Sequence, residues 1–436
     1  MSQVCLCYKP LIHSVNVETD LQSMETSRIE VLEVNKNSET FIDDKIKELP
    51  FYVGNLDSVF EKHQKWQTLL PRVTPFYAVK CNNNLAVLRT LSALGTGFDC
   101  ASKVSMVMSI GVTPDKIIYA HTTKPQSHIR YACAQGVDMM TFDNKEELLK
   151  ITRGHPNAKL LLRIAVDDSK SQVKLSTKFG ATLGTVGSLL KRAHELDLDV
   201  KGVSFHVGSL CTDSVAYRWA IEEAHHVFEQ RLIGFHLDLL DIGGGFSGHG
   251  LEMVLNSKAL DEFFPADSGV RVIAEPGRYF VDSAFTLALN VFARKKVWSL
   301  PISQKGSSKE LLLSYGNGLD TMIMYYVTDG LHGAFGINKL HPDMKPFVLA
   351  QIPVCYLGPT CDSADRIMDV WMPELNIGDW ILVDNFGAYT IPLPTDFNGF
   401  EKPTIYLVVT PQIWKMLNFK VIVWMLSERE RERDSF

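Results

Sequence analysis

The feature that most constrains the fold of this chain is an alternation of short apolar runs with helix-like stretches, from about residue 75 to residue 280. Runs such as "FYAVK", "KLLLRIAV" and "RVIAEPGRY" are separated by stretches such as "LAVLRTLSALG" and "VGSLLKRAHELDLDV". Apolar runs that alternate with helices predict parallel strands, each connected to the next by a crossover helix. Eight such strands predict a closed (β/α)8 barrel of the TIM type rather than an open doubly wound sheet.

The pattern changes beyond about residue 290, where segments such as "MIMYYVTDG" and "DWILVDNFGAYT" alternate with Gly/Pro turns and show little helical periodicity. These segments predict a second, mainly antiparallel β domain. The N-terminal "RIEVLEVN" is expected to lend it a strand, and "SERERERDSF" is typical of a solvated tail. The expected organisation is an N-terminal segment at 1–46, a barrel at 47–290, a β domain at 291–420 and a tail at 421–436.

Polar residues stand at the C-terminal ends of seven of the eight predicted strands, and glycines stand at the end of the other. One such residue often marks only the point where the chain meets water. Several reactive groups at the same end of several strands instead predict a site at the mouth of the barrel, where barrel enzymes place their chemistry. In chain order these residues are Lys80, Asp99, His121, Asp143, Arg163, His206, Gly243 to Gly245, and Glu275 with Arg278.

Charge and cysteine content argue against several classes of protein. A net charge of −6 without a Lys/Arg cluster gives no sign of a nucleic-acid partner. The chain begins without the pattern of a secretory signal and has no apolar run long enough to span a bilayer. Its eight cysteines are scattered and form no CxxC pair, so neither a metal site nor a disulfide framework is indicated. Free thiols fit a reducing compartment, and we expect a cytoplasmic enzyme.

Two motifs at the strand ends suggest a phosphate-bearing ligand. In "DIGGGFSG" the glycine N–H groups could face an anion, although a packing turn explains them equally well. In "AEPGRY" Glu275 ends a strand and Arg278 follows a Pro-Gly turn. This places a carboxylate near a guanidinium group, whose planar set of donors suits a phosphate. Pyridoxal phosphate combines a phosphate, a cationic ring nitrogen and an aldehyde. Lys80 could supply the amine that forms a Schiff base with the aldehyde, and the imidazole of His206 could lie flat against the ring. Taken alone, however, Lys80 is explained as a solvent-exposed residue at a strand end, and His206 as a histidine of the core.

The motifs together resemble the eukaryotic ornithine decarboxylase family of pyridoxal-phosphate enzymes. The resemblance is carried by "PFYAVKCN", "GTGFDCASK", "GVSFHVGS", "LDIGGGF", "GPTCDSADR" and "DNFGAYT", and it runs from about residue 50 to residue 415. It implies the fold of that family, an alanine-racemase-like barrel followed by a β domain. This agrees with the strand pattern, which was read independently of the resemblance.

The resemblance implies a role for each matching residue of the cofactor site. Lys80 would carry the cofactor as a Schiff base, His206 would stack on its ring, and Glu275 would pair with the ring nitrogen. The phosphate would be held by Ser209, Gly245, Gly277, Arg278 and Tyr389. The same cofactor site would include Asp99, Arg163, Gly243, Gly244 and Pro276.

The resemblance also implies how the substrate is handled. Cys361 looks like the acid that reprotonates the α-carbon, although a lone thiol is more often plain filler. Asp329 and Asp362 match the aspartates that receive the distal ammonium of a diamino acid. In the family Cys361 and Asp362 reach across from the partner subunit, which implies a head-to-tail homodimer with shared active sites.

The substrate is less constrained than the reaction. "AHTTK", "HVGSL" with its bulky Leu210, and "DGLHGAF" depart from the decarboxylase pattern, and together they suggest a reshaped pocket. Such divergence resembles leucine decarboxylase, which favours a neutral aliphatic substrate such as leucine. The alternatives are an ornithine decarboxylase that makes putrescine and a non-catalytic antizyme inhibitor. Antizyme binding stays open, because the matching surface keeps Lys124 and Arg130 but differs elsewhere.

Overall fold

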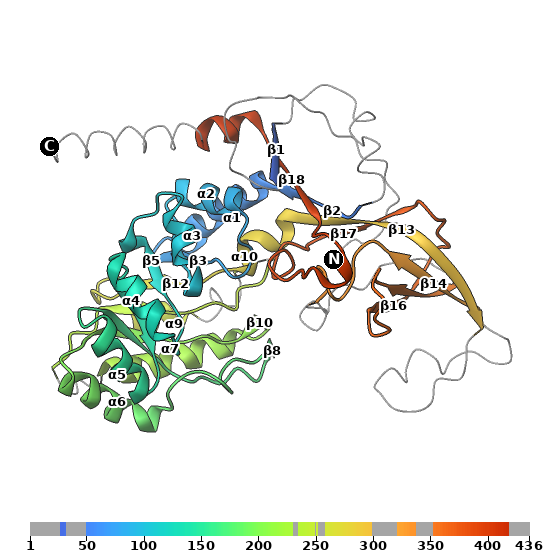
Figure 1. Cartoon of the computed structure of the whole chain (residues 1–436). Coiled ribbons are helices and arrows are strands. Elements are labelled where there is room, and N and C mark those ends of the chain that lie inside the picture. Colours follow the sequence, from blue (N-terminus) through green and yellow to red (C-terminus); the bar gives the residue numbers. More distant parts are fainter. Residues whose placement is uncertain are drawn as a thin grey trace. The chain divides into compact units, whose positions relative to one another are not determined.

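The computed structural model describes residues 27–31, 49–229, 234–248, 250–251, 258–298, 321–336 and 352–417, and it divides into two compact units. The first, the barrel unit, draws on Asn55–Ala284, Gly387–Pro392 and Pro411–Phe436. The second, the β unit, draws on Met1–Gly54, Phe285–Phe386 and Leu393–Thr410. Figure 1 gives the element labels used below. The tail expected at 421–436 and the part of the N-terminal segment before Ser27 lie outside the described residues.

The barrel unit contains a closed barrel of eight parallel strands, which confirms the predicted (β/α)8 fold. Each strand pairs with its neighbour in parallel, and the ring closes where the last strand pairs with the first. In order around the ring the strands are β3 (Val73–Ala78), β4 (Gly97–Asp99), β5 (Ile117–Tyr119), β6 (Met139–Phe142), β7 (Lys159–Arg163), β9 (Asp199–Ser204), β11 (Leu239–Asp241) and β12 (Arg271–Ala274).

Helices connect these strands, and asparagine side chains begin several of them. Asn84 Oδ1 accepts the N–H of Ala86, and Asn144 Oδ1 accepts the N–H of Glu147, so backbone donors at two helix N-termini are satisfied. Short 3-10 turns lie at Ala101–Lys103, Pro114–Lys116 and Asp282–Ala284. The described helices of the barrel unit include α1 (Leu56–Leu69), α2 (Leu85–Ala93), α3 (Val104–Met108), α4 (Gln126–Ala134), α5 (Lys145–Gly154), α6 (Leu183–Glu195), α7 (Ser214–Glu229), α9 (Ala259–Phe263) and α10 (Arg278–Val281).

The inside of the barrel is filled by side chains. Residues from six different strands or strand ends form one buried apolar cluster, so the barrel has a packed core rather than a channel. Because the interior is closed, chemistry is confined to the ends of the strands. The cluster consists of Phe76, Ile118, Ala120, Met139, Leu161, Leu239 and Ile273.

The β unit is a mixed, mostly antiparallel sheet, as predicted. Its strands follow the order β1-β18-β2-β13-β14-β15-β16, and β17 also pairs with β13. The pairs β1 with β18 and β14 with β15 are parallel, whereas the pairs of β13 with β2, β14 and β17 and of β15 with β16 are antiparallel. The strands are β1 (Ser27–Val31), β2 (Phe51–Asn55), β13 (Phe285–Trp298), β14 (Thr321–Val327), β15 (Ile352–Leu357), β16 (Arg366–Met372), β17 (Trp380–Val383) and β18 (Thr404–Val409).

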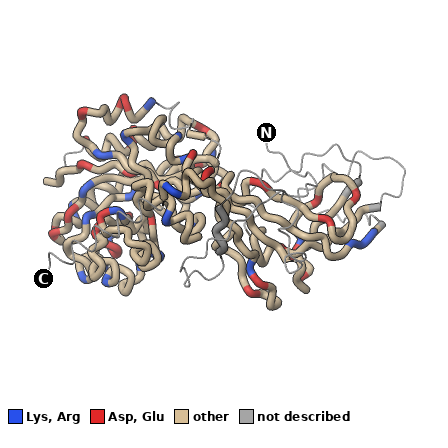
Figure 2. The backbone as a smooth tube through the Cα atoms, turned by 90° about the horizontal axis from the view of Figure 1, so that it is seen from above, with Lys and Arg blue, Asp and Glu red and all other residues tan. Residues whose placement is uncertain are grey.

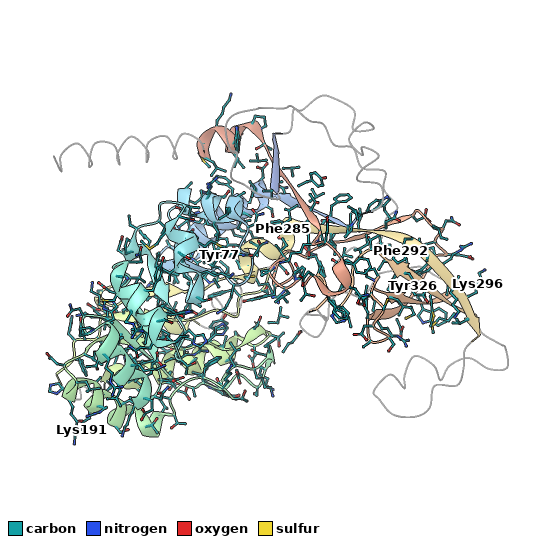
Figure 3. The ribbon with its side chains drawn as sticks, viewed as in Figure 1. Tyr77, Lys191, Phe285, Phe292, Lys296 and Tyr326 are labelled. Carbon is teal, nitrogen blue, oxygen red and sulfur yellow. The ribbon has the colours of Figure 1, made fainter. Side chains whose placement is uncertain are left out.

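The barrel unit is narrower than the 47–290 expected from the sequence. β2 and the start of β13 pair with each other, from Phe285 opposite Gly54 to Ala288 opposite Phe51, so both belong to the β unit. Further along, Phe292 of β13 lies against Tyr326 of β14, with ring centroids 6.4 Å apart (Figure 3). The pairing with β2 therefore places the start of β13 in the β unit, on the N-terminal side of the boundary expected at 290.

Charged residues of both signs are interspersed along the described chain of the barrel unit (Figure 2). Within the described residues, no helix is both long enough and apolar enough to cross a membrane.

One ion-pair network lies inside the barrel unit rather than on its surface. Lys124 Nζ is 2.9 Å from Glu147 Oε1, and both side chains are almost fully buried. Lys150 Nζ contacts the other carboxylate oxygen at 2.6 Å, and Lys124 also donates to the backbone oxygen of Thr141. Burial lowers the pKa of Lys124 to about 8. The Glu147 carboxylate therefore stabilises the ammonium group of Lys124, which burial removes from water.

Replacing Glu147 by alanine is expected to lower the free energy of unfolding by about 3 kcal/mol, because it leaves Lys124 buried without its anion. Urea denaturation followed by tryptophan fluorescence measures the loss. Glu195→Ala is the matched control: it breaks an exposed pair with Arg192 of the same length, 2.9 Å, and should leave the free energy of unfolding almost unchanged. Equal losses for the two variants would contradict the assignment.

Candidate active site at the mouth of the barrel

The polar residues predicted at the strand ends meet at one end of the barrel. Because all eight strands are parallel, their C-terminal ends share one mouth. Backbone bonds extend the strand pairing into this mouth, since Ala78 N donates to Pro276 O and Glu275 N donates to Gly243 O. Tyr389 belongs to the same unit, and its N–H donates to Cys81 O next to Lys80. The residues that end or follow the strands are Lys80, Asp99, Arg163, His206, Gly243, Gly244, Gly245, Glu275, Pro276, Gly277 and Arg278.

The amine of Lys80 lies beside a buried carboxylate. Its Nζ is 3.3 Å from Asp99 Oδ2; the Lys80 side chain is 51% exposed, and that of Asp99 is fully buried. The Asp99 carboxylate raises the pKa of Lys80 above its usual value. Among the described residues, Asp99 Oδ1 has no hydrogen-bond partner. The pair thus presents an accessible ammonium with a proton acceptor behind it.

His206 presents a neutral imidazole at the mouth. Its Nδ1 accepts the backbone N–H of Gly208 at 3.0 Å, which assigns the proton of the neutral ring to Nε2. Burial lowers the pKa of His206 well below its usual value, and the charges of Arg163 and Lys80 act in the same direction. A Cβ on Gly244 would lie 2.8 Å from Nε2, so only glycine lets the backbone pack so closely on this ring.

Arg163 is oriented by a residue that the sequence did not single out. Its guanidinium carbon lies 5.1 Å from the ring centroid of Phe179, and His121 meets the same ring edge-on at 5.6 Å. A guanidinium over an aromatic face is a favourable cation–π arrangement. Phe179 follows no predicted strand, so no local signal marked it.

Glu275 shares a buried region with a second carboxyl that sequence reasoning missed, Asp241. Asp241 Oδ1 accepts the N–H of Gly243 at 2.9 Å, and the side chains of both acids are buried. Burial raises the pKa of Glu275, and the neighbouring Asp241 and Asp99 raise it further. Burial also raises the pKa of Asp241. Each buried carboxyl disfavours the charge of the other, and a cationic ligand group would relieve that repulsion.

Arg278 offers unused hydrogen-bond donors. It is 4% exposed, its Nη1 donates to Asp282 Oδ1 at 3.1 Å, and its guanidinium lies over the ring of Tyr389. Among the described residues, its Nε and Nη2 are buried without a hydrogen-bond partner. A buried guanidinium donor is costly when unpaired, and the planar fork matches phosphate oxygens.

Glycines leave room beside these donors. Gly245 has a φ of +106°, a conformation that favours glycine, and a Cβ there would lie 2.8 Å from Gly208 O. A Cβ on Gly277 would lie 2.9 Å from Cys81 Cβ. Ser209 begins β10 (Ser209–Cys211), which pairs with β8 (Ser171–Val173) in the same unit. Next to Ser209, Leu210 adopts a φ of +55°, an uncommon value for leucine.

The expected substrate residues belong to the β unit and form a cluster there. Asp329 is buried and accepts the N–H groups of Gly330 and Ala334. Burial raises the pKa of Asp329 to about 7. Asp362 Oδ2 lies 2.8 Å from His332 Nε2, and the preceding Cys361 is exposed. The sequence marked His332 only as part of the altered "DGLHGAF" segment and gave no sign of this contact.

Comparison with known proteins gives consistent matches. Residues 56–282 match the family model described as "Pyridoxal-dependent decarboxylase, pyridoxal binding domain". The chain is 46% identical to ornithine decarboxylase of Rattus norvegicus over 419 residues, covering 89% of this chain and 88% of the relative. It is 47% identical to antizyme inhibitor 2 of Xenopus laevis over 386 residues, covering 84% and 82% of the two chains.

A solved structure of similar architecture is the arginine decarboxylase of Paramecium bursaria Chlorella virus bound to agmatine. Its TM-score is 0.72 at 36% sequence identity, and the match covers 83% of this chain and 95% of the viral one.

Proposed function

Because this chain belongs to the ornithine decarboxylase and antizyme inhibitor family of pyridoxal-dependent decarboxylases, we propose that it decarboxylates a basic amino acid, with ornithine as the favoured substrate. The protein is an amino-acid decarboxylase that depends on pyridoxal 5'-phosphate. The observation that carries the cofactor chemistry of this proposal is the pair of unpartnered, buried donors of Arg278, set in the same barrel mouth as the Lys80 amine and the Glu275 carboxyl.

The residues at the barrel mouth fit this cofactor. Arg278 offers donors that lack an acceptor, and Gly245 and Gly277 leave the backbone bare where a phosphate would approach. We propose that Ser209 and Tyr389 also bind the phosphate group. Lys80 Nζ is the amine that would hold the aldehyde, and the face of His206 would lie against the ring.

The residues of the chain then divide the chemical work. When bound, the cofactor withdraws electrons from the substrate α-carbon as CO2 leaves. Glu275 would pair with the ring nitrogen as a carboxylate, and the cationic nitrogen would offset the burial and the neighbouring charge that raise the pKa of Glu275. His206 stays neutral and would therefore add no charge beside the bound cofactor. We propose that Cys361 delivers a proton to the α-carbon after CO2 has left.

A basic substrate is favoured over leucine. The neutral aliphatic substrate expected from the sequence finds no support in the comparisons, whose named decarboxylases act on ornithine, arginine or lysine. The Asp329 and Asp362 carboxyls would receive a distal ammonium, since a cation removed from water needs a paired anion. Asp362 lies next to Cys361, so one segment would supply both the proton and the anchor for the distal group.

We further propose a homodimer in which Cys361 and Asp362 serve the partner's barrel mouth. Cys361 is exposed on its own β unit, which leaves it accessible to a second chain. Mixing Lys80→Ala and Cys361→Ala chains tests this arrangement, because a shared site would restore about a quarter of the wild-type activity in a statistical mixture of dimers.

The deciding experiment measures CO2 release from ornithine, lysine, arginine and leucine by the purified protein loaded with pyridoxal phosphate. We expect turnover of ornithine and little or none of leucine. Turnover of leucine but not of ornithine would restore the neutral-substrate hypothesis. A loaded protein that releases CO2 from none of the four would support a role like that of the antizyme inhibitor relatives.

The charge of Asp99 predicts how fast the cofactor attaches. An amine must be unprotonated to attack an aldehyde, so below the pKa of Lys80 attachment should speed up about tenfold per pH unit. Asp99 is the largest cause of the raised pKa of Lys80. Asp99→Asn should therefore load faster than wild type at neutral pH, measured by absorbance after cofactor is added to cofactor-free protein. Asp261→Asn, an exposed carboxyl in the same unit, is the control and should not change the rate.

A further inference from the structure

The contact between His332 and Asp362 links a titratable cation to a proposed substrate anchor. Their side-chain atoms Nε2 and Oδ2 are 2.8 Å apart, and each side chain is about one-third exposed. The other carboxylate oxygen of Asp362 accepts the N–H of Ala364. The backbone bond and the histidine together lower the pKa of Asp362. Asp362 thus stays a carboxylate and already has a partner before any substrate arrives.

His332 is held in place by its surroundings. Its ring centroid lies 4.3 Å from that of Phe397. The N–H and hydroxyl of Thr395 both donate to the backbone oxygen of His332, at 2.9 and 3.0 Å. Three separate segments, which follow β14, follow β15 and precede β18, therefore converge on one histidine–aspartate pair.

We propose that His332 is a specificity-determining residue that sets the net charge at the Asp362 anchor. The preference for a basic over a neutral amino acid would then depend on pH. When the imidazole is protonated, the pair is neutral and a distal ammonium gains little from it. When the imidazole is neutral, it still donates from Nε2, and the pair carries one negative charge. The inference rests on the proposed function, in which Asp362 receives the distal ammonium.

Other acids of this cluster must be separated from the effect of His332. Asp365 accepts the N–H of Leu331 and the hydroxyl of Thr360, and Asp329 accepts the N–H groups of Gly330 and Ala334. Burial raises the pKa of Asp329 to about 7, so its titration would also strengthen diamine binding as the pH rises. A variant of His332 leaves the Asp329 contribution in place and removes only the contribution of the imidazole.

The test compares two amines that differ only in a distal ammonium, 1,4-diaminobutane and n-butylamine, as ligands of the cofactor-loaded protein. Their dissociation constants are measured by calorimetry near pH 6 and near pH 8, on either side of the range in which histidine changes charge. His332→Gln keeps a neutral donor to Asp362, and His332→Phe keeps the ring contact with Phe397 without a donor. Melting temperatures show that each variant is folded.

Near pH 6 we expect both variants to bind the diamine about two- to fivefold more tightly than wild type, because their Asp362 charge is not cancelled. Near pH 8 wild type and His332→Gln should agree, and the monoamine should be unaffected throughout. Equal diamine affinities of wild type and both variants near pH 6 would overturn the inference. The binding measurement needs no turnover. The inference about His332 can therefore be wrong even if the protein decarboxylates ornithine, and it can be right even if the protein does not.

Discussion

Replacing Lys80 by alanine is expected to lower kcat by a factor on the order of 10⁴, because it removes the accessible amine that lies beside the buried Asp99 carboxylate. Asp99 and Arg278 remain, so the variant should still bind the cofactor, but without a covalent bond. Two measurements check this: CO2 release, and peptide mass spectrometry after borohydride reduction. In wild type, reduction should fix the cofactor to the peptide that contains Lys80.

Lys191→Ala is the matched control, since Lys191 is an exposed lysine on α6 that projects into solvent (Figure 3). It should leave both measurements unchanged. A Lys80→Ala protein that keeps more than about a tenth of the activity would contradict the assignment, as would reduced cofactor on another lysine. A small primary amine added to Lys80→Ala should restore part of the activity, which loss of folding could not explain.

Glu275→Gln is expected to lower kcat by roughly 10²- to 10³-fold while the cofactor stays bound. Glutamine has nearly the same shape but cannot become an anion, so the ring nitrogen loses the carboxylate that keeps it protonated. The KM for the amino acid should change less than about tenfold, since Glu275 acts on the cofactor and not on the substrate directly. Absorbance of the bound cofactor confirms loading, and Glu262→Gln, at an exposed pair with Arg218, is the control.

The same variant should change stability in the opposite direction. Burial and the neighbouring Asp241 raise the pKa of Glu275 in the folded, cofactor-free protein. Unfolded chains therefore lose this proton first as the pH rises, and stability falls between the usual carboxyl range and the raised pKa. Glu275→Gln removes that loss, so the cofactor-free variant should melt at a higher temperature than wild type near neutral pH. A variant that is both inactive and less stable would indicate simple damage to the fold.

The sequence predicted the barrel well because its signal is local. The spacing of apolar residues within a short window predicts each strand and helix. Because the strands are parallel, Lys80, Asp99 and Glu275 then lie at the same end of the barrel. The roles assigned to these residues remain predictions, which the two variants above test. The boundaries expected at 47 and 290 differ from those of the two units, because the pairing of β2 with β13 places both strands in the β unit.

What the sequence alone determined is the fold, the family and the kind of chemistry, since all three follow from periodicity and from motifs that are contiguous in the chain. Only the tertiary structure decided which side chains lie next to one another. Asp241 beside Glu275, Phe179 beside the guanidinium of Arg163, and His332 on Asp362 are neighbours that lie far apart in the sequence. The charge state of a side chain depends on its burial and on charges a few ångströms away. A periodic sequence pattern predicts which face of a strand or helix is buried, but it does not predict which residues pack against that face.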